Sequence, residues 1–98
     1  MYAIWTLFTL GPGMRETADT MGEKWIPILR AMPGFVSGTF LRDEEAGEYG
    51  AMTLWESRAA AESALAETER PFQEEVAHIA QGPPTRTLLA VWQQVGPA

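Results

Sequence analysis

His78 is the one histidine in this 98-residue chain, and imidazole is the side-chain type that changes charge nearest neutral pH. It is therefore the catalytic residue that the sequence predicts, a group that could hold or move a proton beside a ligand. The alternative is structural. A histidine in the last turn of a helix interacts favourably with the helix dipole and needs no ligand.

Glu74 and Glu75 precede His78 by four and three residues, within reach of it on a helix surface. The three side chains could in principle hold a metal ion. A metal site usually needs three ligands that converge in a cavity, so we interpret this group as a solvated acidic face and predict no metal.

Aromatic residues are frequent, with four Trp, four Phe and two Tyr, and could form the walls of a flat pocket. Trp25 and Trp55 are the predicted walls, because Trp25 lies close to a proline within a helix and Trp55 lies near a strand end. Further candidates are Tyr49, Trp5 and Trp92. For each of them the alternative is a place in the core or in a subunit interface.

A few polar residues on predicted strands could orient an oxygenated ligand. Arg86 is the charged one, and its neutral companions are Thr6, Thr53, Ser37 and Thr39. Alternation along a strand does not settle which face each side chain occupies. Arg86 could equally be solvated at the sheet edge or form an ion pair across a dimer.

Six elements are predicted to position these residues. A period of two marks strands over residues 2–9, 35–42, 49–56 and 85–95, and a period of three to four marks helices over 14–32 and 58–80. Pro27 and Pro71 predict a kink or break near residues 24–27 and an interruption at 70–71. Ser57 can cap the second helix, and Gly47 suits positive φ in the polar link between strands two and three.

The element order β-α-β-β-α-β predicts an α+β, ferredoxin-like domain over residues 1–98. Its sheet has four antiparallel strands, and both helices lie on one face. Large apolar side chains occur on both faces of each strand, so a monomer would expose an apolar sheet face. We therefore predict a homodimer that pairs through this sheet face.

Composition excludes several classes of site, partner and location for this protein. The chain is 46% hydrophobic, so it should fold, and it has no cysteine for a disulfide, a thiolate zinc site or a nucleophile. Its net charge of −6 predicts no nucleic-acid partner. The strand-like start at Tyr2 and the lack of a long apolar run predict no signal peptide and no membrane span, hence a cytoplasmic protein.

The segment MPGFVSGTFLRDEEAGEYGAMTLWESRAAAESAL, residues 32–65, holds three distinctive motifs. They are Pro33-Gly34-Phe35 before strand two, Leu41-Arg42-Asp43 at its end, and Leu54-Trp55-Glu56-Ser57 before an alanine-rich helix start. With these motifs and the element order, the chain resembles the antibiotic biosynthesis monooxygenase-like family of dimeric α/β barrels.

The resemblance implies a small dimer with a pocket between sheet and helices. Some members use it for cofactor-free oxygenation of aromatic polyketides and others for haem degradation. Haem-degrading members carry an Asn, a Trp and a His, and here Thr6, Ala64 and His78 stand near those places. The chain has no Asn, which also removes the Asn that some oxygenases of the family use to hold substrate.

The sequence thus predicts a pocket for a small, largely aromatic molecule, used without metal or flavin. If it oxygenates the ligand, the substrate forms its own carbanion and reacts with dioxygen, with His78 handling the proton. Two alternatives stay open. One is a non-catalytic ligand-binding or assembly module whose barrel is filled by its own side chains, and the other is a haem-binding protein with His78 as axial ligand.

Overall fold

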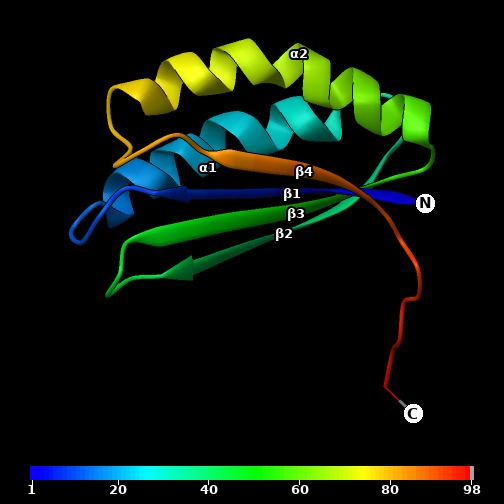
Figure 1. Cartoon of the computed structure of the whole chain (residues 1–98), viewed down its shortest axis with the longest axis horizontal. Helices are drawn as coiled ribbons and strands as arrows, with labels where there is room; N and C mark the ends of the chain where they lie inside the picture. The colour runs from blue at the N-terminus through cyan, green and yellow to red at the C-terminus, as the bar shows by residue number, and fades with distance from the viewer. Residues whose placement is uncertain (98) are drawn as a thin grey trace.

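The computed structural model of the chain describes residues 1–97 and has the predicted element order. The elements are β1 (Tyr2–Thr9), α1 (Arg15–Arg30), β2 (Phe35–Asp43), β3 (Glu48–Trp55), α2 (Arg58–Ala77) and β4 (Thr85–Ala90). The strands form one sheet of order β2-β3-β1-β4 in which each neighbouring pair is antiparallel. Both helices lie on the same side of this sheet (Figure 1), which confirms the predicted ferredoxin-like fold.

The central strand β1 sets which residues face the helices. Its register places Ile4 opposite Thr53 of β3 and opposite Leu88 of β4. Ile4 and Thr53 are buried and Leu88 is half-buried, so this face is the one that the helices cover. Side chains two positions apart along a strand point to the same face of the sheet, so this register identifies the helix-facing residues of all the paired strands.

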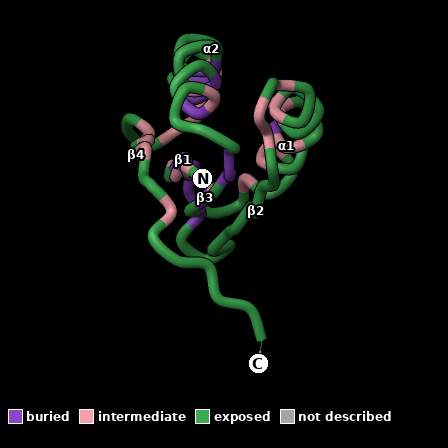
Figure 2. Tube along the Cα trace, turned by 90° about the vertical axis from the view of Figure 1, so that its right-hand side faces the viewer, coloured by how far each residue is buried: buried purple, intermediate pink, exposed green. Residues whose placement is uncertain are grey.

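The two helices are seated differently. α2 buries five side chains at steps of three or four residues: Ala61, Ala64, Thr68, Phe72 and Val76. α1 buries Met21 alone. Figure 2 shows α2 above β1 and β3 and α1 on the β2 side of the sheet. The loose seating of α1 leaves room beneath it.

The predicted break in the first helix and interruption of the second are wrong. α1 continues through Pro27 to Arg30, and α2 continues through Pro71 to Ala77. A helical proline leaves the carbonyl four residues before it without its usual donor. Those carbonyls belong to Glu23 and Glu67, which like both prolines are exposed, so water can bond to them.

The last strand is shorter than predicted. β4 ends at Ala90, which pairs with Tyr2 at the beginning of β1, so no partner strand lies beyond it. Val91 still donates a backbone hydrogen bond to the Met1 carbonyl at 3.0 Å. The chain then leaves the sheet (Figure 1), and Trp92 is 91% exposed.

Local signals in the sequence position the remaining connections. The Ser57 side chain accepts a hydrogen bond from the Ala60 amide at 3.1 Å, as expected of an N-cap. Gly47 has a φ of +69° and its carbonyl accepts from the Leu10 amide at 2.8 Å, which ties the β2–β3 hairpin to the end of β1. The β2–β3 register shifts between Phe35 and Ser37, a β-bulge near the beginning of the edge strand.

The opposite face of the sheet is apolar and uncovered. Four large side chains on it are more than a third exposed: Leu7, Leu41, Met52 and Leu89. Neither α1 nor α2 lies on this side (Figure 1). None of the helices within residues 1–97 is long and apolar enough to cross a membrane.

Candidate functional site

A cavity of about 680 Å³ lies between the helices and the sheet. All six elements contribute to its lining, with the helix-facing residues of the sheet on one side and the inner residues of α1 and α2 on the other. Its volume lies within the range that small-molecule sites occupy.

Aromatic side chains form much of the wall. Phe8 stacks on Tyr49 with ring centroids 5.8 Å apart, and Phe72 meets Phe8 edge-on at 5.5 Å. Trp25 from α1 meets the same Phe72 edge-on at 6.0 Å. Trp55 also lines the cavity, and it has no surface exposed to bulk solvent. A wall of this kind favours flat, apolar ligands.

Both cavity tryptophans have their indole N–H groups bonded to protein. Trp55 Nε1 donates to Thr53 Oγ1 at 2.9 Å, and both residues are buried. Trp25 Nε1 donates to Glu75 Oε2 at 3.0 Å, which joins α1 to α2. These bonds fix the orientation of the two rings, so the cavity wall is shaped before a ligand enters.

Arg86 is the charged group under α2. Its Nε donates to Thr6 Oγ1 at 3.2 Å, and its guanidinium carbon lies 5.4 Å from the centre of the Phe72 ring. Nη1 is buried and has no hydrogen-bond partner among residues 1–97. Burial lowers the pKa of the Arg86 guanidinium because the charged form loses water, and the negative charge of Glu69 partly opposes that shift.

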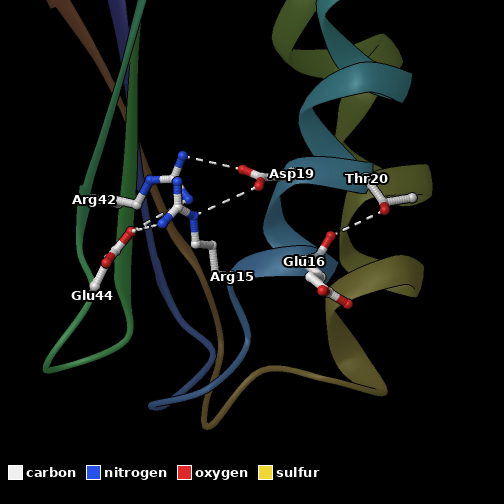
Figure 3. Close-up of polar contacts among 6 residues, drawn as sticks. All are labelled: Arg15, Glu16, Asp19, Thr20, Arg42 and Glu44. Carbon is white, nitrogen blue, oxygen red and sulfur yellow. Dashed lines mark hydrogen bonds and ion pairs between the residues drawn. The ribbon is translucent and has the colours of Figure 1, made fainter.

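The other charged residues that line the cavity are exposed: Asp19 and Glu23 on α1 and Arg42 on β2. Arg42 Nη2 lies 3.1 Å from Asp19 Oδ1, and Arg15 Nη1 lies 3.3 Å from Glu44 Oε1 (Figure 3). These ion pairs connect the first half of α1 to the end of β2 and to the turn that follows it.

The six residues that the sequence predicts to contact substrate all line this one cavity: Thr6, Trp25, Tyr49, Thr53, Trp55 and Arg86. The helix-facing orientation of the five strand residues follows from the register, which places Thr6 opposite Arg86 and Tyr49 opposite Phe8. Trp25 reaches the cavity from α1. The aromatic candidates Trp5 and Trp92 lie elsewhere. Trp5 covers Gly50 on the uncovered sheet face, and Trp92 follows β4.

His78 is not among the cavity residues. It caps the C-terminus of α2 and is exposed, whereas Val76, two positions earlier, is buried. Two residues turn a helix by about 200°, so the two side chains point in nearly opposite directions. The structure therefore does not bring His78 together with the six cavity residues, and an axial ligand for haem in the cavity would have to come from elsewhere.

No group of three His, Cys, Asp or Glu side chains within residues 1–97 could hold a metal ion. Glu75 is engaged instead by Lys24 Nζ at 2.8 Å and by Trp25, and Glu74 pairs with Arg70 along α2. The acidic residues before His78 thus act as partners of cations and of an indole.

The lining residues that were not predicted as site residues include the large side chains Phe8, Met21 and Phe72. Each had a detectable signal. Phe8 shares the strand face of Thr6, and Met21 and Phe72 lie on the apolar stripes of their helices. An apolar residue on the inner face of a helix or strand is ordinarily part of the core. These side chains belong to a cavity wall because there is a gap under α1.

The same fold occurs in solved structures of oxygenases. A monooxygenase from the gene ActVA-Orf6 of Streptomyces coelicolor, in complex with nanaomycin D, matches with a TM-score of 0.78 and 17% identity, over 99% of this chain and 92% of that one. A point mutant of SnoaB, a cofactor-independent oxygenase from Streptomyces nogalater, matches with a TM-score of 0.77 and 20% identity, over 98% and 97%. A structure described as an antibiotic biosynthesis monooxygenase matches with a TM-score of 0.75 and 14% identity, over 95% and 100%. The chain has the antibiotic biosynthesis monooxygenase fold.

No model of a protein family and no curated protein matches the chain. Identities of 14–20% establish the fold and leave the chemistry to the residues of the site. The features of this site on which a function can be argued are an aromatic cavity wall, two bonded indoles and a cation under α2.

Proposed function

We propose that this protein binds a small, flat, largely aromatic molecule in the cavity between its helices and its sheet. The observation that carries the proposal is the cavity of about 680 Å³ whose wall includes Phe8, Trp25, Tyr49 and Phe72. A protein that used its barrel only for assembly would fill this space with its own side chains. The structural neighbour that holds nanaomycin D supports the proposal.

We further propose that the bound molecule is oxygenated without a cofactor, the reaction class of the neighbour SnoaB. A ring methylene made acidic by adjacent carbonyl or aryl groups loses a proton, and the carbanion bonds to dioxygen. Loss of water from the resulting peroxide leaves a carbonyl. Each methylene and one O₂ give one carbonyl and one water, so the substrate supplies every electron.

In this reaction the chain supplies a largely apolar cavity wall and a cation. Exclusion of water protects the carbanion from reprotonation, and Arg86 stabilises negative charge on a substrate oxygen. We leave His78 out of the proposal because it is exposed and does not line the cavity.

A cavity-filling variant tests the proposal. Ala51 is half-buried and lines the cavity, so Ala51→Phe should occupy ligand volume, whereas Ala66→Phe adds the same ring to an exposed position on α2. We expect nanaomycin D or 2-naphthamide to quench the tryptophan fluorescence of the native protein and of Ala66→Phe, and to bind at least about tenfold more weakly to Ala51→Phe. Failure of both ligands to bind the native protein contradicts the binding function.

The reaction is tested with 1,8-dihydroxyanthrone in an oxygen electrode. We expect oxygen uptake above the spontaneous rate, one O₂ per quinone formed, and loss of the excess in Ala51→Phe. If the protein binds the ligand but does not raise oxygen uptake above the spontaneous rate, the oxygenase proposal is wrong and the protein is a ligand-binding module.

We also propose that the uncovered sheet face pairs with the same face of a second copy. It carries Leu7, Leu41, Met52 and Leu89, all more than a third exposed. The charged residues that the register places on this face, Asp43 and Glu48, lie opposite each other at its hairpin end. Each copy carries a net charge of −6, so the apolar part of this face away from those carboxylates is where two copies approach with least repulsion. An apolar patch formed by three or more strands is typical of an interface.

A further inference from the structure

The four charged residues that line the cavity differ in their access to water. Asp19, Glu23 and Arg42 are exposed, and Arg86 is covered by α2. Arg86 is therefore the charge that a ligand meets once it has left bulk solvent. Interactions with it are screened less than those at the cavity rim.

Arg86 also differs in its partners from four of the other five arginines, the fifth being the exposed Arg30. Arg15, Arg42, Arg58 and Arg70 each lie within 3.3 Å of a carboxylate oxygen. Arg86 has instead one neutral acceptor, Thr6 Oγ1, and a ring face, Phe72. Its Nη1 is buried without any hydrogen-bond partner among residues 1–97.

A buried guanidinium N–H without an acceptor is unfavourable, and native proteins seldom retain one without a role. The neighbouring groups do not relieve it, because Thr6 Oγ1 accepts from Nε and no protein acceptor within residues 1–97 lies within hydrogen-bond distance of Nη1. Water in the cavity can supply the acceptor, and a ligand that displaces this water has to supply it instead.

We propose that Arg86 is an anion subsite and that the natural ligand is an acid: an aromatic molecule carrying a carboxylate, or an enol or phenol bound as its anion. This rests on the proposed binding function and specifies its ligand class. A carboxylate can accept two parallel bonds from a guanidinium, and an enolate or phenolate can accept one. The aromatic wall then holds the ring system while Arg86 fixes its oxygen end.

The experiment compares two ligands of nearly equal shape in the native protein at pH 7, 2-naphthoate and its neutral amide, 2-naphthamide. We expect the naphthoate to bind at least about tenfold more tightly, the effect of one charge-assisted bond in a site shielded from water. The Arg86 Nε–H proton resonance should shift on adding naphthoate. This comparison needs no variant, so it holds even if changes at Arg86 impair folding.

Variants then locate the preference. Arg86→Gln should reduce the naphthoate preference to less than about threefold, and Arg86→Lys should keep part of it because the charge remains. Arg70→Gln is the matched control, since Arg70 is an exposed arginine of α2 outside the cavity lining, and it should bind both ligands as the native protein does.

Two outcomes overturn the proposal in distinguishable ways. Equal affinity for both ligands in the native protein removes the anion subsite and leaves the aromatic cavity standing. No binding of either ligand, nor of nanaomycin D, removes the binding function and the anion subsite together.

Discussion

Asp19 Oδ1 on α1 lies 3.1 Å from Arg42 Nη2 on β2, and both residues line the cavity. The pair joins the loosely seated helix to the edge strand of the sheet (Figure 3). Met14, Ala18 and Met21 pack on the core near the beginning of α1, and this exposed ion pair adds a direct link from the helix to β2. An exposed pair contributes up to about 1 kcal/mol, enough to affect how often the helix separates from the strand.

Arg42→Gln should therefore speed the exchange of a neutral cavity ligand. We expect the association and dissociation rates of 2-naphthamide to rise together by roughly two- to fivefold, because losing an ion pair worth up to about 1 kcal/mol changes a rate by a factor of this size. Stopped-flow tryptophan fluorescence measures both rates. Arg58→Gln, which breaks an exposed pair with Glu62 away from the cavity, should leave them unchanged. Equal effects of the two changes would contradict the role of the Asp19–Arg42 pair.

Glu75 should prove more important for stability than its neighbour Glu74. Its carboxylate accepts from Lys24 Nζ and Trp25 Nε1, which binds α2 to α1, and its side chain is only 21% exposed. Glu75→Ala should lower the free energy of unfolding by roughly 1–2 kcal/mol. Glu74→Ala breaks one exposed pair with Arg70 and should cost less than about 0.5 kcal/mol. Urea denaturation compares the two, and similar losses would refute the link between the helices.

Thr53→Val should destabilise the fold although the two side chains have nearly the same shape. The change removes the acceptor of Trp55 Nε1, which lies in a side chain with no exposed surface. A buried donor left without a partner costs about 1–3 kcal/mol. Thr53→Ser keeps the hydroxyl and should recover most of the loss in a thermal or urea melt. A stable Thr53→Val protein would show that the indole finds another acceptor.

Gly47→Ala should be among the most damaging single changes in the chain. A Cβ at this position would overlap the backbone carbonyl group of Gly11, and the backbone has a φ of +69°. Strain and overlap together predict a loss of roughly 2–5 kcal/mol. Gly13→Ala isolates the strain, because Gly13 has a φ of +81° with nothing within 4 Å of its would-be Cβ, and it should cost about 1 kcal/mol. Equal losses in the two variants would exclude the overlap.

The dimer is tested by a charge in the middle of the uncovered sheet face. Met52→Glu should convert a dimer to a monomer in sedimentation velocity experiments, because two copies would bury like charges near the twofold axis. Glu67→Lys on the exposed side of α2 should leave the association unchanged. A native protein that sediments as a monomer at micromolar concentration would refute the pairing.

The fold was predictable because its signals are local and agree with one another. Strand alternation, Gly47 in the link between β2 and β3 and the Ser57 cap each agree with the element order that the structure has. The two errors in the fold prediction, the helix breaks at proline and the end of β4, concern properties that a sequence pattern does not contain. Whether Pro27 breaks a helix depends on whether water reaches the carbonyl of Glu23, and where β4 ends depends on where its partner β1 begins.

Part of the cavity lining was predictable from the sequence, and the chemistry of the cavity less so. Trp25, Trp55 and Arg86 were chosen for their types. The register places Trp55 and Arg86 on the helix-facing side of the sheet, and α1 brings Trp25 to the same cavity. His78 was chosen for its chemistry alone, and the helix turns it away from the cavity. The missing hydrogen bond of Arg86 is a property of three-dimensional packing, which no spacing in the sequence reports.

The β-bulge between Phe35 and Ser37 also affects how the protein behaves at high concentration. An unpaired outer strand is a template on which another chain can add and extend the sheet without limit. The register shift interrupts the regular row of donors and acceptors at the beginning of β2, so a foreign strand cannot dock along the whole edge. At this edge of the sheet the bulge therefore opposes fibril growth, and the proposed pairing through the apolar face would give a closed dimer that does not use the edge.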